Sequence, residues 1–423
     1  MMTQAYYTGI SGLKTYSEGI NVVSDNIANI STTGFRAYNA EYASLFEDAL
    51  TSASSNLGSS NTEGLGTRMQ ATPMSTAQGS LALSDRNTDL ALMGEGWFGI
   101  DGGGETLYTR AGDFVFDENS DLVTPDGYYV LGTKGGNISD DNVLTEQLDS
   151  VALGDVAGQE QLRFPKTLTY PPEPTTEATF NGNIGVGSEG YETVTMGAGI
   201  IDPENNRNNL QLSFTKSATQ MPPGTQWDVT ATVTSIDGKT IYDMQQGVIA
   251  FDETGALISS TLPAVDNNGA PVTINLGDGY NGVVSIDTEV VPGSSTADGT
   301  IGGDLEGYAI NQNGEVIATF TNGKQSSVGQ IAVYHFQNDQ GLERVTGTHF
   351  AQSDNSGAAI FYQNADGENI VGTDILNFRL ENSNVELDSA LTELIVLQRA
   401  YDANSKSVTT ADQMMQKALN MDA

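Results

Sequence analysis

Cysteine is absent from the 423-residue sequence, and basic residues are scarce: 17 Lys and Arg stand against 54 Asp and Glu. Without cysteine, disulfides, thiolate metal sites and thiol catalysis are excluded. A formal net charge of −37 argues against nucleic acid and anionic membranes as partners, because both are bound through basic patches. The same charge predicts that self-association weakens at low ionic strength, where repulsion between subunits is least screened.

Long apolar runs are missing as well. No stretch approaches the roughly 18 consecutive apolar residues of a membrane-spanning helix, so no membrane insertion is expected. The first twenty residues lack the basic start and apolar centre of a cleaved secretion signal. We therefore expect any export of this protein to proceed without an ordinary signal peptide. The 48 glycines and 38% hydrophobic residues are typical of a turn-rich chain with enough apolar material for several folded domains.

No catalytic or cofactor-binding constellation is recognisable, so we expect neither an enzyme nor a bound cofactor or metal. Residues 94–99 (GEGWFG) have the glycine spacing of a dinucleotide-binding motif, but residues 97–104 predict strand and turn where that motif needs a helix. Residues 117–121 (DENSD) resemble the start of a calcium loop without its later Gly and Glu, so a hairpin turn is predicted. His335 and His349 are interpreted as structural residues.

Both ends of the chain predict amphipathic helices. In residues 4–30, one heptad row contains Tyr6, Leu13, Ile20 and Ile27, and its neighbour contains Gly9, Tyr16, Val23 and Ile30. In residues 385–420, one row contains Leu387, Leu394, Tyr401, Val408 and Met415, while the partner row has Leu391 and Leu419 with polar residues between them. An apolar seam of this period requires another helix against it. The two ends are therefore predicted to pair with each other and with neighbouring molecules; two ordinary surface helices on a core are the simpler alternative.

The seam positions are the candidate subunit-interface residues. They are Tyr6, Ile10, Leu13, Tyr16, Ile20, Val23, Ile27, Leu387, Leu391, Leu394, Ile395, Tyr401, Val408, Met415 and Leu419.

Between the two ends, alternating apolar residues and turn formers predict β-strands. Prolines at 165, 171, 172 and 174 predict one stiff connection, and residues 293–303 predict a second, flexible one. The expected fold is mainly β with α-helical termini, in a nested multidomain order. Residues 1–30 pair with 385–423 as a terminal helical coiled coil, 31–75 form a connecting segment, 76–165 with 301–384 form an inner β domain, and 166–300 form an inserted outer β domain. Within 31–75 a short helix is expected, followed by a loose stretch over 51–66.

Three stretches of the chain resemble the bacterial flagellar rod and hook proteins. The first joins SDNIAN (24–29) to TGFR (33–36), the second contains YTRAGDF (108–114) and LVTPDGY (122–128), and the third is ELIVLQRAYDAN (393–404). They occur in the family's order and cover both ends and the first β segment. The resemblance marks as motif residues Asn26, Asn29, Thr33, Gly34, Phe35, Thr109, Arg110, Ala111 and Gly112.

The resemblance implies a structural subunit whose terminal helices line a tubular polymer, with the β domains at larger radius. It implies export, without a cleaved signal, through the flagellar type III apparatus to an extracellular place in the hook or basal body. Because rod proteins are usually much shorter, the length and the inserted domain favour the hook, a curved tube that transmits torque. Implied partners are further copies of the chain, the distal rod protein, the hook cap protein and the hook–filament junction protein. A distal rod or other hook-like axial protein is the nearer alternative, and a secreted β-rich adhesin or carbohydrate-active protein the more distant one.

Overall fold

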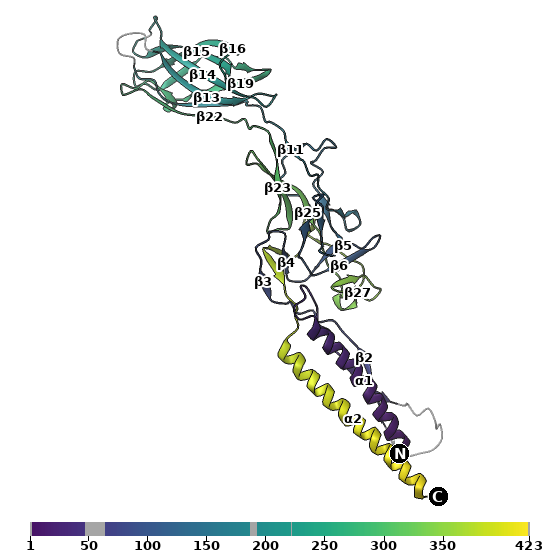
Figure 1. The fold of residues 1–423 in the computed structure, drawn as a ribbon. Coiled ribbons are helices and arrows are strands. Elements are labelled where there is room, and N and C mark those ends of the chain that lie inside the picture. Colours follow the sequence, from purple (N-terminus) through teal and green to yellow (C-terminus); the bar gives the residue numbers. More distant parts are fainter. Residues whose placement is uncertain (1, 47–63, 187–192, 221, 422–423) are drawn as a thin grey trace.

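The computed structural model describes residues 2–46, 64–186, 193–220 and 222–421. The molecule is elongated, with two helices at one end, a β domain in the middle and a second β domain at the far end (Figure 1). Helix α1 spans Met2–Ala28 and helix α2 spans Leu387–Met421. Both chain termini lie at the helical end (Figure 1). The predicted fold, mainly β with helical termini, is confirmed. Neither long helix of the described residues combines the length and apolarity that a membrane span requires.

The two helices pack against each other in antiparallel orientation, through glycines of α1 at the end far from the β domain and through larger apolar side chains near it. A Cβ atom at Gly9 would lie 2.6 Å from the Val408 Cγ2 atom, and one at Gly12 would lie 2.5 Å from the Asn404 Oδ1 atom. Glycine therefore lets the two backbones approach closely at the far end of the pair. Nearer the β domain, a conventional apolar cluster takes over, formed by Tyr16, Ile20, Val23, Ile27, Val385, Ala390, Leu394 and Leu397.

The segment after α1 forms strands and no helix in its described part. Strand β1 (Glu41–Phe46) pairs in antiparallel fashion with β2 (Gly64–Ala71), and the Thr15 hydroxyl of α1 donates to the Thr67 carbonyl at 2.9 Å. The short helix predicted within residues 31–75 is therefore wrong, since Tyr42 and Leu45 belong to a strand beside α1. Most of the loose stretch predicted over 51–66 lies outside the described residues.

The middle domain is built from two separate parts of the chain. The first part contributes β3 (Leu81–Leu83), β4 (Leu90–Met93), β5 (Trp97–Asp101), β6 (Thr106–Thr109), β7 (Val115–Phe116), β8 (Leu122–Val123), β9 (Tyr129–Lys134), β10 (Glu160–Gln161) and β11 (Thr169–Tyr170). The second contributes β23 (Gly303–Ile310), β24 (Glu315–Phe320), β25 (Gln325–Ile331), β26 (Val333–Tyr334), β27 (Glu343–Thr346), β28 (His349–Ala351), β29 (Tyr362–Gln363), β30 (Asn369–Ile370), β31 (Asp374–Asn377) and β32 (Arg379–Glu381). Two 3-10 turns, Val156–Gly158 and Asp339–Gly341, complete it.

Strands from the two parts alternate within the middle domain, so neither part closes the sheet alone. The main sheet has the order β11-β23-β24-β25-β9-β5-β6-β28-β27. Smaller pairs join β3 to β32 and β4 to β31. The apolar core draws on both parts, for example Phe98 and Phe114 from the first and Phe320 and Ile331 from the second.

The far domain consists of two sheets around one core. One sheet has the order β13 (Val194–Ile201), β14 (Arg207–Lys216), β15 (Thr225–Ser235), β16 (Ile241–Phe251) and β17 (Leu257–Ser260). The other contains β12 (Glu177–Asn183), β18 (Val265–Asn267), β19 (Ala270–Asn275), β20 (Gly277–Asp278), β21 (Asn281–Val284) and β22 (Val291–Ala297). Phe180, Phe214 and Trp227 are buried between them. The flexible connection predicted at 293–303 is wrong over its first part, because residues up to Ala297 pair with β12.

A narrow neck of two chain segments joins the far domain to the middle domain (Figure 1). Strand β11 pairs with the start of β23, and beyond it Glu173 and Thr300 exchange two backbone hydrogen bonds of 2.9 Å each. The Tyr170 hydroxyl donates to the Glu173 carboxylate at 2.5 Å. The neck is thus a two-stranded antiparallel ribbon.

The two ligand-like loops found in the sequence are turns. Gly94 and Gly96 both have positive φ and lead into strand β5, where a dinucleotide motif would start a helix. The Asp117 carboxylate accepts the backbone N–H groups of Asn119 and Asp121 at 2.7 and 2.9 Å, which is the bonding of a hairpin turn. His335 and His349 are both buried, and burial lowers the pKa of each, so both are neutral structural residues near pH 7.

Candidate functional site

The residues singled out in the sequence gather at the helical pair and at its junction with the middle domain. Of the predicted seam positions, Tyr16, Ile20, Val23, Ile27 and Leu394 lie in the apolar cluster between α1 and α2. Val408 faces Gly9. Tyr6, Leu13 and Met415 are half-buried, and the side chain of Leu419 lies outside what the structure describes.

Several predicted seam positions are exposed and do not lie between the helices. On α2 they are Leu387 and Tyr401 of the first row, Leu391 of the partner row, and Ile395; on α1 it is Ile10. The second row that meets α1, beside Leu394 and Val408 of the first row, is instead Ala390, Leu397 and Asn404. Apolar periodicity missed it because Asn404 is polar and the facing residue, Gly12, has no side chain to mark it as a contact.

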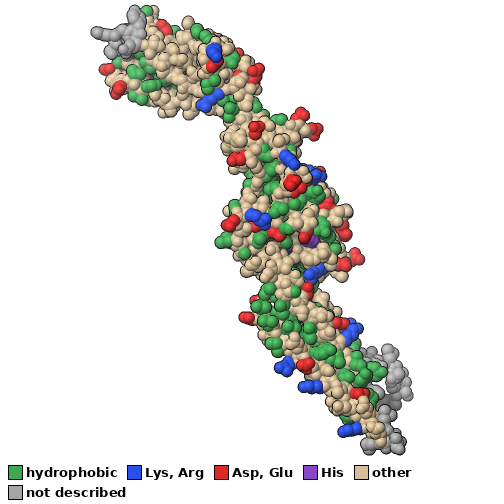
Figure 2. Space-filling model, viewed as in Figure 1, with side chains coloured by type: hydrophobic (Ala, Val, Ile, Leu, Met, Phe, Trp, Pro, Cys, Tyr) green, Lys and Arg blue, Asp and Glu red, His purple; other side chains and the backbone are tan. Residues whose placement is uncertain are grey.

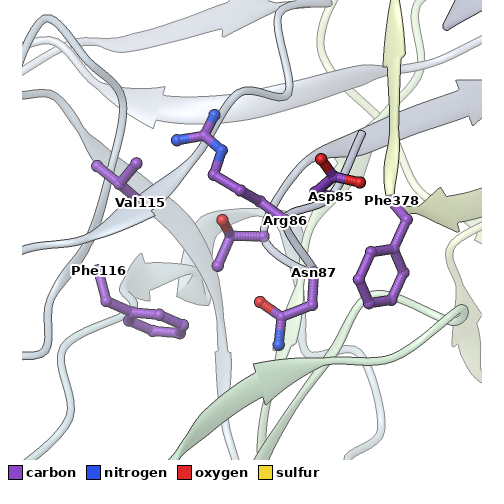
Figure 3. A pocket seen from close by; sticks show the side chains of 7 residues that line it. Asp85, Arg86, Asn87, Val115, Phe116 and Phe378 are labelled. Atoms are coloured by element: carbon purple, nitrogen blue, oxygen red, sulfur yellow. The ribbon is translucent and has the colours of Figure 1, made fainter. Parts of the chain in front are cut away.

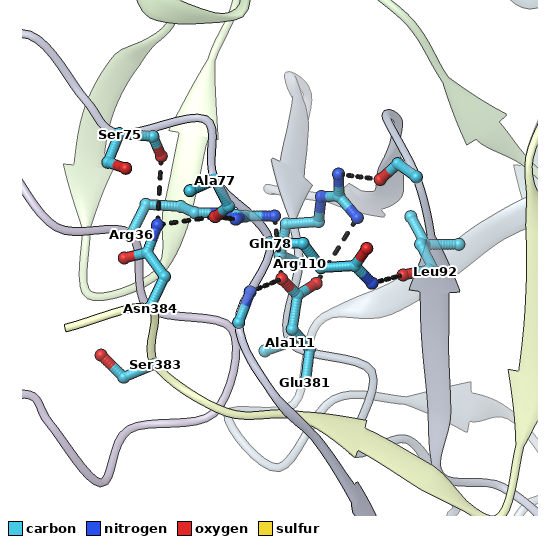
Figure 4. Close-up of polar contacts among 12 residues, drawn as sticks. Arg36, Ser75, Ala77, Gln78, Leu92, Arg110, Ala111, Glu381, Ser383 and Asn384 are labelled. Carbon is cyan, nitrogen blue, oxygen red and sulfur yellow. Dashed lines mark hydrogen bonds and ion pairs between the residues drawn. The ribbon is translucent and has the colours of Figure 1, made fainter. Parts of the chain in front are cut away.

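Glu381 is the centre of the junction between the helices and the middle domain (Figure 4). Its side chain is buried at the end of β32, six residues before α2 begins. One carboxylate oxygen lies 2.9 Å from the Arg36 Nη2 atom and the other 3.4 Å from the Arg110 Nη1 atom. The carboxylate also accepts the Gly79 backbone N–H at 2.9 Å. Glu381, which itself lies shortly before α2, thus ties that part of the chain to the segment after α1 and to the end of β6.

Both arginines are buried and make further hydrogen bonds. Arg36 donates to the Ala77 carbonyl, and Arg110 donates to the Gly94 carbonyl at 2.5 Å. The Arg110 guanidinium also lies over the Trp97 ring, 5.6 Å from its centroid. Burial lowers the pKa of both, that of Arg110 to about 10, while Glu381 opposes the shift. Both arginines stay protonated at neutral pH. We call Arg36, Arg110 and Glu381 the triad.

Motif residues of the first stretch complete the junction around this triad. The Asn26 side chain exchanges two hydrogen bonds with the Tyr38 backbone, at 2.7 and 2.9 Å. Asn29 ends α1 by donating to Asp25. Gly34 has φ +67°, and its N–H donates to the Glu381 carbonyl at 2.8 Å. A Cβ atom there would lie 2.4 Å from the Ala111 backbone nitrogen, so only glycine fits.

The remaining motif residues lie within the same region. Phe35 is buried under the Arg344 guanidinium, whose central carbon is 5.2 Å from the ring centroid. Arg344 also pairs with Asp25 of α1 at 2.8 Å. The Thr109 hydroxyl accepts the Ala111 N–H, and Gly112 pairs with Leu90, where a Cβ atom would clash with the Leu90 carbonyl. Thr33 is half-buried beside them.

Asn384 joins the two connecting segments on the other side of the triad. Its side chain accepts the Ala37 N–H at 2.7 Å and donates to the carbonyls of Ser75 and Ala77 at 3.3 and 2.8 Å. Sequence reasoning missed both Glu381 and Asn384, because their partners lie about 300 residues away and leave no local pattern. These contacts hold the segment after α1 and the segment before α2 rigidly to the middle domain. The described residues contain no cluster suited to holding a metal ion.

Three protein-family models match the stretches that form this region. One described as "Flagella basal body rod protein" matches residues 7–36, one described as "Flagellar hook protein FlgE/F/G D1 domain" matches residues 91–169, and one described as "Flagellar basal body rod FlgEFG protein C-terminal" matches residues 377–421.

Several relatives match this chain over almost its whole length. The chain is 26% identical to the flagellar hook protein FlgE of Treponema pallidum over 478 residues, covering 99% of this chain and 100% of the relative. It is 28% identical to that of Borreliella burgdorferi, with 99% and 100% covered, and 26% identical to that of Escherichia coli, with 99% and 100% covered. A crystal structure of Helicobacter pylori flagellar hook protein FlgE2 aligns with 71% of this chain and 100% of its own, at 17% identity and a TM-score of 0.49.

Proposed function

We propose that this chain, which belongs to the family of flagellar rod and hook proteins, is the subunit of the flagellar hook. The observation that carries the proposal is similarity from end to end, through the far β domain as well as the helices, to proteins named flagellar hook protein. As a structural subunit it needs no catalytic group. Its work is to polymerise into a curved tube and to carry torque along it.

The surface that supports polymerisation is an apolar stripe on α2, formed by Leu387, Leu391 and Ile395. These residues are spaced four apart, so they lie on one side of the helix, and Ile395 is 57% exposed. Val396 and Tyr401, and Tyr7 and Ile10 on α1, add further exposed apolar side chains. Figure 2 shows apolar side chains gathered along the helical end. Contiguous exposed apolar surface marks association sites, and in a tube made of one protein the partner at the helices is another copy.

The proposal is tested by charging this stripe. The purified chain is expected to assemble into curved tubes visible by electron microscopy. Leu391→Glu with Ile395→Glu is expected to raise the critical concentration for assembly by about 100-fold or more, because each carboxylate would be buried unpaired at a contact, at a cost of several kcal/mol. Helix content and melting temperature should stay unchanged, since both positions are already exposed in the monomer.

The matched control places the same charges at exposed positions of α2 outside the stripe. Ala403→Glu with Ser407→Glu, both exposed and also four residues apart, is expected to assemble nearly as the unmodified chain does. Equal assembly of the stripe variant would contradict the role given to the helices. Straight tubes from the unmodified chain would favour a distal rod protein over a hook subunit.

We further propose that the far domain is an independent insert bounded by the neck. Because Glu173 and Thr300 already form a hydrogen-bonded antiparallel pair, residues 174–299 can be replaced by an Asn-Gly turn, which closes such a pair with little strain. The shortened chain is expected to keep the middle domain folded, with its own cooperative melting transition by calorimetry. Removing only residues 194–216 serves as the control and should abolish the transition of the far domain, because β13 and β14 supply its core. Loss of cooperative melting in the shortened chain would show that the insert boundaries are wrong.

A hook subunit would also contact other flagellar proteins. We propose that a tube of this subunit meets the distal rod protein at one end and a hook–filament junction protein at the other, with a cap protein during growth. We also propose that the chain reaches this extracellular place through the flagellar type III export apparatus. The support for these partners is membership of the family alone.

A further inference from the structure

One arginine joins the edge of the middle domain to helix α1. Arg344 lies on β27, an edge strand of the main sheet, on the side of the domain that faces α1 (Figure 1). Its Nη1 atom lies 2.8 Å from an oxygen of the Asp25 carboxylate on α1, and its Nε–H donates to the Gly347 carbonyl at 2.8 Å. Because Gly347 belongs to the turn between β27 and β28, the guanidinium ties this hairpin to the helix.

Two aromatic rings hold this guanidinium in one orientation. Its central carbon lies 5.2 Å from the centroid of the Phe35 ring and 5.6 Å from that of the Tyr38 ring. Both rings belong to the segment that follows α1, and the Tyr38 backbone is bound to the Asn26 side chain. A planar guanidinium stacks its faces on rings while its edge binds a carboxylate, which an ammonium group does not do. We call Arg344 with Asp25, Phe35 and Tyr38 the Arg344 contact.

The last turn of α1 is electrostatically unfavourable on its own. Asp25 lies in this turn, where a carboxylate opposes the helix dipole, and the turn contains no basic residue. Arg344 supplies a positive charge from the middle domain. Among the described residues, no other ion pair joins either helix to that domain. The electrostatically favourable place for this end of α1 is therefore beside β27.

The Arg344 contact differs from the triad in what it holds. The triad and Asn384 bind the segments that flank the helices, whereas the Arg344 contact holds a residue of the helix itself. The side chains of Arg344 and Asp25 are 29% and 47% exposed, so their ion pair adds little to stability. Its main effect is to restrict the tilt of the helical pair on the middle domain.

We propose that Arg344 is a positioning residue for assembly, which fixes the tilt of the helical pair on the middle domain. The proposal rests on the proposed function, because it gives the contact a role in a tube of copies. Where the stripe of α2 joins neighbouring copies, the direction in which each middle domain leaves its helices determines the diameter of the tube. A helical pair that tilted freely would give tubes of uneven diameter.

The tilt can be measured with two spin labels, because the chain has no cysteine of its own. One label is attached at Ala5→Cys, an exposed position near the end of α1 that lies far from the middle domain. The other is attached at Asp85→Cys. Asp85 is exposed and lines an open hollow beside Arg86 and Asn87 (Figure 3), so a label has room there. Pulsed electron paramagnetic resonance then gives the distribution of distances between the labels.

Arg344→Ala is expected to widen this distribution while helix content and melting temperature change little. The helix between Asp25 and Ala5 is a lever of about 30 Å, so a tilt of about 10° moves the label by about 5 Å. We expect widening by at least that displacement. Arg344→Lys keeps a charge for Asp25 but loses the stacking on the rings, so its distribution should have an intermediate width. Salt at about 1 M, where the Debye length is about 3 Å, should widen the distribution of the unmodified chain and leave that of Arg344→Ala unchanged.

The matched control is Arg163→Ala, because Arg163 makes the same kinds of contact within the middle domain. It pairs with Asp121 at 3.0 Å and lies over the Tyr129 ring, 5.4 Å from its centroid. Its loss should leave the distribution unchanged. The variants are then assembled without labels, and Arg344→Ala is expected to give tubes with a wider spread of diameters than Arg163→Ala, as measured by electron microscopy.

Four results would overturn the proposal. They are an unchanged distribution in Arg344→Ala, equal widening in Arg163→Ala, a loss of helix content in Arg344→Ala, which would give the residue a role in folding, and an equal spread of tube diameters in the two variants. Failure of the unmodified chain to form tubes would reject the proposed function. The distances in the monomer would then still decide whether Arg344 fixes the tilt.

Discussion

Replacing Glu381 by alanine is expected to destabilise the protein by about 3–5 kcal/mol, the usual cost of removing one member of a buried ion pair. Arg36 and Arg110 would remain buried, each without its carboxylate partner. The Gly79 N–H would also lose its acceptor. The measurement is the urea midpoint followed by both tryptophan fluorescence, which reports the β domains, and far-UV circular dichroism. We expect the helices to melt earlier than the β domains in the variant.

Two further variants separate charge from packing. Glu160→Ala removes an exposed carboxylate, 3.5 Å from Lys134, and should cost less than about 1 kcal/mol, as surface pairs do. Replacing Glu381, Arg36 and Arg110 together by leucine should recover part of the stability lost in Glu381→Ala, because no unpaired charge remains. If Glu381→Ala proves no more costly than Glu160→Ala, the triad does not hold the junction.

Replacing Gly9 and Gly12 by leucine is expected to separate the helical pair. Two opposing effects act on the stability of the pair. Each leucine gains less than about 1 kcal/mol of helix propensity over glycine, but overpacking a close contact costs about 1–3 kcal/mol at each site. Because the two backbones approach through these glycines, the clash outweighs the gain in propensity. We expect protection of α1 amides against hydrogen exchange to fall about ten-fold or more.

Alanine at the same two sites provides the comparison. Its Cβ atom would meet the Val408 methyl group at the first site and the Asn404 amide oxygen at the second. The amide can turn aside, whereas Val408 is held in one rotamer in a helix, so the alanine variant should cost clearly less than the leucine variant. Equal protection of α1 in the leucine and alanine variants would argue against close packing at these glycines.

The outline of the fold was predictable from local pattern, but the contacts were not. Apolar residues that recur every 3.5 positions predicted both helices, and turn sequences such as Pro125-Asp126-Gly127 predicted hairpins. Apolar periodicity then assigned Leu391 to the helix contact, although the seam at that end of α2 uses Ala390 and Leu397. A pattern that counts apolar residues favours the exposed stripe when the true contact is made by glycine, alanine and asparagine.

Two other segments were predicted wrongly because their local sequence does not suggest a strand, whereas hydrogen bonds to a neighbouring strand make them one. Residues 41–46 contain an apolar spacing compatible with a helix, yet this segment pairs with β2 as a strand, and its Tyr42 ring contacts the Tyr16 ring of α1. Residues 291–297 are rich in Gly, Ser and Pro, yet they complete the sheet beside β12. The buried triad had no sequence signal, since Arg36 and Glu381 are distant in sequence and either residue alone is typical of a surface position.

The ribbon that forms the neck restricts the direction in which the far domain can move. A single chain segment would act as a swivel, free to rotate about its own bonds. Two antiparallel segments joined by the Glu173–Thr300 pair resist twisting and resist bending within their common plane, because one strand would have to stretch while the other shortens. Bending across the face of the ribbon needs no such change. The far domain therefore has one easy axis of tilt, and its orientation relative to the middle domain, measured subunit by subunit around a curved tube, would vary about that axis.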